Sequence, residues 1–162
     1  MTGMLFEYFN LMEIENPTVV EVVGDAAMPA AMSMTSGSFS GKNRCDAATE
    51  AMEHTLVTLT KVVVTTAEDK YKHFFVDDGS GPVLVGNAMY RAMNPLRLSL
   101  GDTLLSLTGI ITYEYGYYEI NPRDPGDIGG VQYTSGAPPV NDYPAITISE
   151  VGRCRLTLSS PI

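Results

Sequence analysis

Three observations predict an all-β protein built round a five-stranded Greek-key barrel, with extra strands at both ends of the chain and one short helix. Nearly every regular stretch repeats its apolar residues with a period of two, as strands do, and not with the longer period of a helix. The core elements follow the order strand, strand, tight turn, strand, helix, strand, strand, which is the order of such a barrel. Gly109 falls inside a long strand, where a barrel needs a bend or bulge to close. A chain of 162 residues is long enough for one domain that buries about 70% of its unfolded surface.

The two longest strands are expected at residues 55–66 and 102–116. The first, TLVTLTKVVVTT, alternates apolar residues with threonine before it becomes a β-branched run. In the second, DTLLSLTGIITYEYG, alternation predicts one side that holds Leu105, Leu107, Gly109, Ile111 and Tyr113. Shorter strands are expected at residues 17–24, 73–78, 82–87, 117–120, 144–152 and 155–160. Residues 86–96 are expected to hold the helical turns, which Pro95 ends.

Composition divides this single domain into three parts: acidic N-terminal strands with a long loop (1–53), the barrel core (54–128), and a C-terminal loop with strands (129–162). The whole chain has 10 basic and 19 acidic residues and a net charge of -9. This charge opposes long-range attraction to a phosphate backbone. No run of about 18 apolar residues occurs, so we expect no membrane span.

Two adjacent carboxylates, Asp77 and Asp78, precede a Gly-Ser-Gly sequence at the tip of an apolar hairpin. Asp and Gly adopt turn conformations readily, and an Asp side chain caps its own turn, so we expect a β-turn here. The alternative is a calcium or magnesium site. Hard cations need several oxygen ligands, and the segment supplies only these two carboxylates and Ser80. The metal site is therefore the weaker interpretation.

Three motifs carry a resemblance to a known fold: VDDGSG at 76–81, GDTLLSLTGI at 101–110 and PRDPGDI at 122–128. Together with the strand before them, they make residues 49–128 similar to the OB-fold module of secreted bacterial nucleases and related extracellular or algal proteins. The resemblance implies an OB-like barrel, single-stranded nucleic acid as the ligand class, and an extracellular or secreted location. In those nucleases the catalytic domain is a separate one, so the resemblance implies no enzymatic activity for these residues.

The aromatic run YEYGYY is the best candidate for a binding surface. OB-folds bind single-stranded nucleic acid by stacking bases on aromatic side chains flanked by basic residues. The candidate ligand-binding residues are Tyr71, Lys72, Phe74, Tyr113, Tyr115, Tyr117 and Arg123. Alternation predicts Tyr113 and Tyr115 on one face, and Tyr118 on the side opposite Tyr117. The alternative is that the tyrosines pack across strands or line an interface.

Three further residues each have two interpretations. Arg123 either binds a ligand or pairs with Asp124 or Asp127 at the closing segment of the barrel. Cys45 and Cys154 either form a disulfide, which would close a long loop, or are two free thiols. Neither cysteine belongs to a CxxC pair or lies near a His cluster that would indicate zinc.

These observations predict a non-catalytic binding module for single-stranded nucleic acid or a protein partner. The sequence contains no GxSxG, HExxH or P-loop motif, so we expect neither an enzyme nor a bound cofactor. The alternative is a structural protein that assembles into homo-oligomers, with its flanking strands added to the edges of neighbouring barrels.

Overall fold

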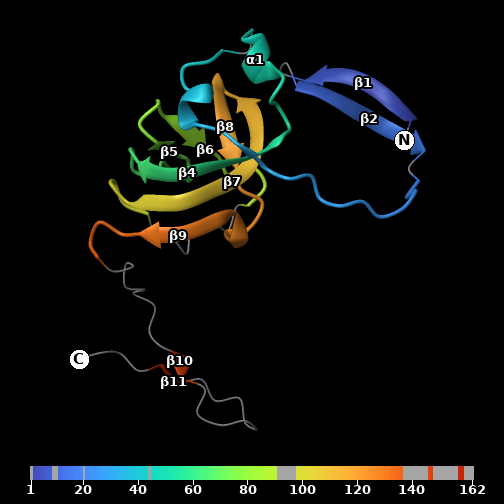
Figure 1. Ribbon diagram of the computed structural model, residues 1–162. Helices are drawn as coiled ribbons and strands as arrows, with labels where there is room; N and C mark the ends of the chain where they lie inside the picture. The colour runs from blue at the N-terminus through green and yellow to red at the C-terminus, as the bar shows by residue number, and fades with distance from the viewer. Residues whose placement is uncertain are drawn as a thin grey trace.

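The chain folds round a closed barrel of five strands (Figure 1), in a computed structural model that describes residues 2–8, 11–19, 21–43, 45–90 and 98–136, with the backbone of 146–147 and 157–158. The barrel strands are β4 (Leu56–Val64), β5 (Phe74–Asp77), β6 (Val83–Val85), β7 (Thr103–Glu114) and β8 (Tyr117–Asn121). They are hydrogen-bonded in the order β4-β5-β6-β8-β7, and β7 returns to pair with β4. β6 and β8 run parallel, and the other pairs in the ring are antiparallel. This closed, mixed ring confirms the predicted OB-like barrel.

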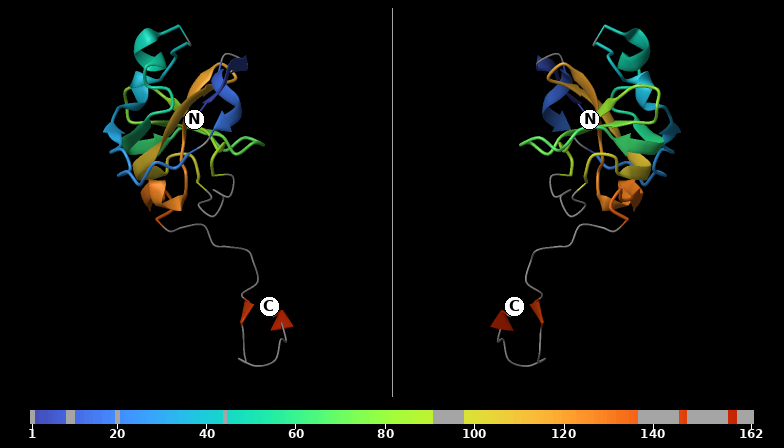
Figure 2. Two further views of the ribbon diagram at one scale, coloured as in Figure 1. Left: turned by 90° about the vertical axis from the view of Figure 1, so that its right-hand side faces the viewer. Right: turned by 90° about the vertical axis from the view of Figure 1, so that its left-hand side faces the viewer.

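The other described elements lie outside the ring. They are β1 (Thr2–Tyr8), β2 (Leu11–Val19), β3 (Met32–Ser33), η1 (Ser36–Ser38), α1 (Ala47–Glu50), η2 (Pro125–Asp127), β9 (Ile128–Gln132), β10 (Ile146–Thr147) and β11 (Thr157–Leu158). β3 extends the sheet beside β4, β9 extends it beside β7, and β1–β2 and β10–β11 are separate hairpin pairs. Figures 1 and 2 show α1 at one end of the barrel and η2 at the other. Within this part of the chain, no helix is long and apolar enough to cross a membrane.

Within the residues that it describes, the structure departs from two local predictions. The short helix was expected at residues 86–96, but residues 86–90 are irregular, and residues 91–96 lie outside the described part of the chain. The described helix is α1, whose first turn is capped by Asp46: its carboxylate accepts a hydrogen bond from the backbone N–H of Thr49 at 3.1 Å. Residues 129–132 were expected to form a loop, but they belong to β9, because β7 is long enough to offer them a partner strand.

Side chains that alternate along the ring strands fill the barrel interior. The fully buried ones include Val57, Leu59, Val62, Val64, Val76, Val83, Val85, Leu104, Leu107, Ile111 and Ile120. The alternation changes phase at Lys61 in β4, where φ is +51°. It also changes in β7, where Leu105 is 41% exposed although we expected it on the same side as Leu107 and Ile111, which are buried. A fixed period of two fails at these points because long strands bend to close a ring.

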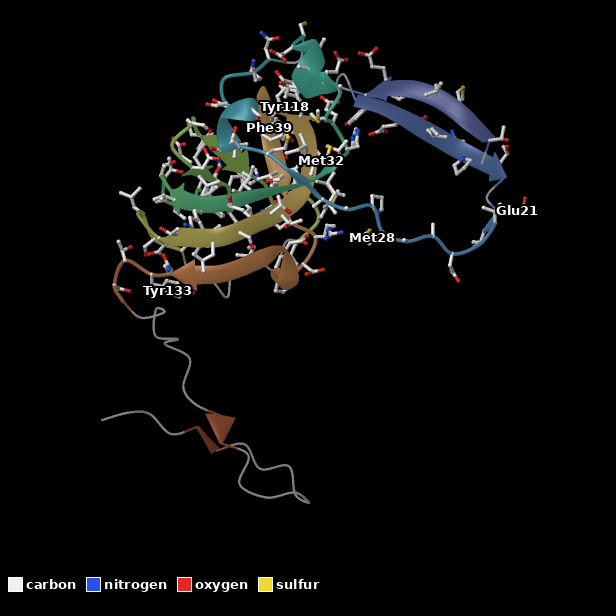
Figure 3. All side chains as sticks on the ribbon, in the orientation of Figure 1. Glu21, Met28, Met32, Phe39, Tyr118 and Tyr133 are labelled. Carbon is white, nitrogen blue, oxygen red and sulfur yellow. The ribbon has the colours of Figure 1, made fainter. Side chains whose placement is uncertain are left out.

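Tyr118 has a buried hydroxyl that finds no hydrogen-bond partner among the described residues. Figure 3 shows it near Phe39 at the α1 end of the barrel. Burial raises the pKa of Tyr118 to about 12, and the nearby carboxylates of Glu53 and Glu50 add to the effect.

We expect Tyr118→Phe to raise the free energy of unfolding by about 1 kcal/mol, because it removes an unsatisfied polar group and keeps the ring. Urea denaturation would measure the change. Tyr117→Phe, at a tyrosine that is 54% exposed, is the control and should leave stability unchanged. A clear loss of stability in Tyr118→Phe would show instead that the hydroxyl is bonded.

Candidate ligand-binding pocket

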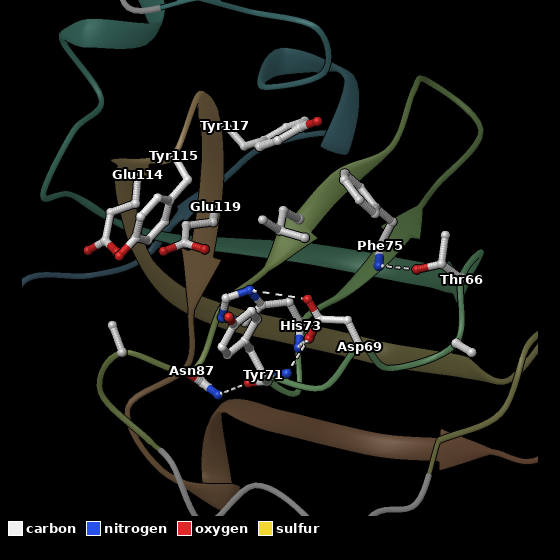
Figure 4. Close-up of a pocket in the computed structure, with 13 residues that line it drawn as sticks. Thr66, Asp69, Tyr71, His73, Phe75, Asn87, Glu114, Tyr115, Tyr117 and Glu119 are labelled. Carbon is white, nitrogen blue, oxygen red and sulfur yellow. Dashed lines mark hydrogen bonds and ion pairs between the residues drawn. The ribbon is translucent and has the colours of Figure 1, made fainter.

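A pocket of about 970 Å³ lies on the outer face of the barrel. Its floor is formed by β5, β6 and β8, and its walls by the loop between β4 and β5 (residues 65–73) and the turn between β7 and β8 (residues 115–116). Figure 4 shows Tyr71, His73 and Asp69 on the loop side, facing Glu114 and Tyr115 on the turn side. A pocket of this size accommodates a side chain or a small molecule.

The floor is a row of cross-strand neighbours. Phe75 in β5 pairs with Leu84 in β6, and Leu84 pairs with Glu119 in β8. Directly paired residues project from the same face of a sheet, so these three side chains lie together. Phe74 and Ile120, the sequence neighbours of Phe75 and Glu119, project into the barrel and are buried. The floor therefore follows from the register of the sheet.

Aromatic rings form much of the pocket wall. The rings of Phe75 and Tyr117 meet edge to face with centroids 5.9 Å apart. The Tyr115 side chain is 93% exposed, and its backbone has a positive φ of 49°, which reverses the chain between β7 and β8. Tyr71 completes the wall from the loop side, and Lys70 Nζ lies 4.7 Å from the centroid of its ring.

Glu119 is a carboxylate buried at the pocket floor, with 3% of its surface exposed. The Thr112 hydroxyl and the Asn121 amide each donate a hydrogen bond to its Oε1 atom at 3.3 Å. Its Oε2 atom accepts no hydrogen bond from any described residue. A Cβ at Gly86 would lie 2.6 Å from this oxygen, so the chain passes over it only with glycine. Burial raises the pKa of Glu119; the Asn121 bond lowers it and the charge of Glu114 raises it further.

Asp69 shapes the loop that covers the floor. Its Oδ1 atom accepts hydrogen bonds from the backbone N–H groups of Tyr71 and His73, both at 2.8 Å. This Asx-type turn brings the Tyr71 side chain to the pocket. The Asn87 side chain also donates a hydrogen bond to the Tyr71 carbonyl, which ties the loop to the segment after β6.

The structure brings together Tyr71, Tyr115 and Tyr117 from the predicted aromatic set, and all three line the pocket. Phe74 does not, because it is buried in the core. Tyr113 packs edge to face on Tyr118, with ring centroids 4.8 Å apart, and contributes to the core. The expectation that Tyr113 and Tyr115 share a face is wrong, since the alternation ends at the β7–β8 turn.

The two predicted basic residues lie outside the pocket lining. Lys72 forms an ion pair with Glu68 at 3.2 Å. Arg123 donates from Nε and Nη2 to the two carboxylate oxygens of Asp127 at 2.8 and 2.7 Å. Arg123 thus takes the structural role that was its alternative, and its hydrogen bonds lower the pKa of Asp127 against the effect of burial.

The Asp77-Asp78 segment forms the β-turn that we expected between β5 and β6. Asp77 Oδ1 accepts hydrogen bonds from the backbone of Gly79 and Gly81, and Asp78 accepts from the hydroxyl and backbone N–H of Ser36. Burial raises the pKa of Asp78, but the bonds from Ser80 and Ser36 outweigh this effect and leave it lowered. The two carboxylates therefore fasten η1 to the hairpin. Across the described ranges, no three His, Cys, Asp or Glu side chains are grouped to hold a metal ion.

The predicted disulfide stays a prediction. Cys45 is an exposed free thiol where the structure describes it, and Cys154 lies outside the described residues.

Sequence reasoning missed the charged side chains of the pocket: Asp69, His73, Glu114 and Glu119. The strand pattern gives a usable signal for Glu119, because this residue lies between two residues whose side chains are buried in the core, Tyr118 and Ile120. Asp69 gives another, since an Asp two residues before Tyr71 favours an Asx turn.

The fold and the pocket define the protein as a small five-stranded β-barrel with an acidic, aromatic pocket over β5, β6 and β8. Residues 25–132 match a family described as a domain of unknown function (DUF8508), and the chain belongs to that family. The match covers the barrel and β9 and begins after the β1–β2 hairpin. Comparisons with curated proteins and with solved structures give no significant match.

Proposed function

We propose that this protein is a non-catalytic binding module that holds a segment of a partner protein in the pocket described above. The observation that carries the proposal is the place of the pocket on the barrel. It lies over β5 and β6, the second and third strands of the ring, between the β4–β5 loop and the β7–β8 turn. OB barrels bind extended polymers on this face with these two connections. The ligand class is argued from the site itself, because the fold alone does not specify it.

The charge of the pocket favours a protein segment over single-stranded nucleic acid. Its lining includes the carboxylates of Asp69, Glu114 and Glu119 and, among the described residues, no Lys or Arg. Affinity for nucleic acid comes largely from phosphates that are neutralised by basic side chains. A phosphate backbone in this pocket would meet carboxylates instead. Exposed tyrosines suit a protein ligand, since Tyr is among the residues that dominate protein interfaces.

Selection of a random peptide library displayed on phage against the whole chain tests this function. We expect selected peptides to bind wild type and to lose about tenfold or more in affinity with Tyr117→Ala, because Tyr117 and Phe75 form one wall. Fluorescence anisotropy of the synthetic peptides would measure the loss. Tyr8→Ala is the matched control, since Tyr8 and Tyr117 are equally exposed at 54%. Peptides that bind both variants equally, or selective binding of oligo-dT, would overturn the proposal.

The β1–β2 hairpin favours a second candidate function, self-association. The apolar side chains that the structure describes there are exposed on both faces, with Met4 at 63%, Leu5 at 69% and Ile14 at 50%. The linker through Glu21 and Met28 leads from the hairpin to the barrel (Figure 3). A lone two-stranded hairpin is only marginally stable in water. We infer that a second copy of the chain covers it by strand pairing.

Light scattering after size-exclusion chromatography tests self-association. Residues 1–41 hold five acidic and no basic side chains, so we expect the mass to rise above 17.5 kDa as salt screens this repulsion. A chain that starts at residue 25, where the family match begins, should remain monomeric. A monomer at every salt concentration would exclude this function.

A further inference from the structure

We propose that the pocket recognises a basic side chain, the guanidinium of Arg or the ammonium of Lys, seated against Glu119 and Glu114 between the tyrosine rings. The inference rests on the proposed function, whose protein segment would carry this side chain.

Glu119 is the first reason. Its side chain is almost wholly buried and lines the pocket, and one of its oxygens, Oε2, accepts no hydrogen bond from the described residues but is not fully enclosed, so it is reached by solvent. A buried carboxylate is costly unless a donor or a positive charge satisfies it. Burial raises the pKa of Glu119, although the Asn121 hydrogen bond and the charge of His73, which also lines the pocket, lower it. A cation in the pocket would place a permanent positive charge beside this carboxylate.

The side chains around Glu119 point to an organic cation. Glu114 lies across the turn and also lines the pocket, and Figure 4 shows both carboxylates beside the ring of Tyr115. Cations bind over the faces of tyrosine rings, and the Lys70 ammonium already does so on Tyr71, at 4.7 Å. Two carboxylates beside aromatic rings therefore form an acceptor for a group that is both charged and partly apolar.

The probe is a fluorescein-labelled peptide of four Gly-Arg repeats, compared with the same peptide containing citrulline or lysine and titrated into the whole chain. We expect saturable binding of the Arg and Lys peptides and at least about tenfold weaker binding of the citrulline peptide, which lacks the charge. Glu119→Gln should weaken binding by about tenfold, and Glu114→Gln by about fivefold. Glu114 lies at the end of β7, outside the buried cluster of Glu119, Thr112 and Asn121. Glu114→Gln therefore keeps the test valid if Glu119→Gln does not fold.

Glu50→Gln is the charge-matched control, because Glu50 is an exposed residue of α1 outside the pocket. It should change affinity by less than about twofold. Equal losses in all three variants would mean general attraction to an acidic chain and would overturn the inference. Spermidine that binds more tightly than the peptide, with the same dependence on Glu119, would overturn the protein source and leave a free polyamine as the cation.

The inference and the proposed function fail in different ways. If the Arg and Lys peptides do not bind while phage-selected peptides still depend on Tyr117, the cation inference is wrong and the binding module stands. If no peptide depends on Tyr117, both are wrong.

Discussion

Gly109→Ala is expected to lower the free energy of unfolding by about 3 kcal/mol, the upper part of the range for overpacked interiors. β7 pairs with β9 as far as Leu107 and with β8 from Ile110, so Gly109 lies where β7 exchanges one neighbour for the other. A Cβ at this position would lie 2.7 Å from the backbone carbon of Asn121 and from a side-chain carbon of Ile120. Backbone atoms in a closed ring have little freedom to move away.

Urea denaturation would measure this loss as a shift of the midpoint at constant slope. Gly41→Ala is the control, because Gly41 has open space where the Cβ would be; unlike Gly109, it adopts a positive φ, of 60°. It should cost about 1 kcal/mol, the strain of the left-handed backbone alone. If Gly109→Ala costs no more than this control, β8 does not approach β7 as closely as described.

Asp102→Asn is expected to lower the free energy of unfolding by about 2–3 kcal/mol. The Asp102 carboxylate is 1% exposed and links two loops: Oδ2 accepts from the Ser99 N–H at 2.7 Å, and Oδ1 from the Thr134 N–H at 2.8 Å and its hydroxyl at 2.6 Å. Asparagine has the same shape, but its amide nitrogen must face one of these N–H donors. One of these backbone donors therefore loses its acceptor in the variant.

The effect of Asp102→Asn should depend on pH. Burial raises the pKa of Asp102, but the hydrogen bonds from Thr134 and Ser99 outweigh it, so the pKa is lowered in the folded protein. A lowered pKa stabilises the fold above the unfolded value of about 3.9, and this stability is lost as the pH falls through the folded pKa. We expect the full difference in free energy of unfolding between wild type and Asp102→Asn at pH 7, and we expect this difference to shrink below about pH 4. Asp25→Asn, on the exposed linker, should differ from wild type by less than about 0.5 kcal/mol at pH 7.

The order of the barrel strands could be predicted from the sequence because each signal is local. The β-branched run of β4, the turn at Asp77-Asp78 and the long alternation of β7 depend on residues close in sequence. The helix prediction at residues 86–96 is not met over residues 86–90, the part of that range that the structure describes. A short apolar segment carries too little periodic signal to separate a turn of helix from irregular chain.

The sequence by itself determined that this protein is a β-barrel and that tyrosines gather near the end of β7, since period and composition require no distant contact. The tertiary structure decided which of two adjacent phenylalanines faces the pocket, because a shift of one residue in register exchanges the faces of a strand. It also decided the burial of Glu119. By alternation Glu119 points to the outer face of the barrel, and a carboxylate on an outer face is normally solvated. It is buried because Gly86 lets the chain pass over it and the loop held by Asp69, about fifty residues earlier in the sequence, forms the wall of the pocket above it.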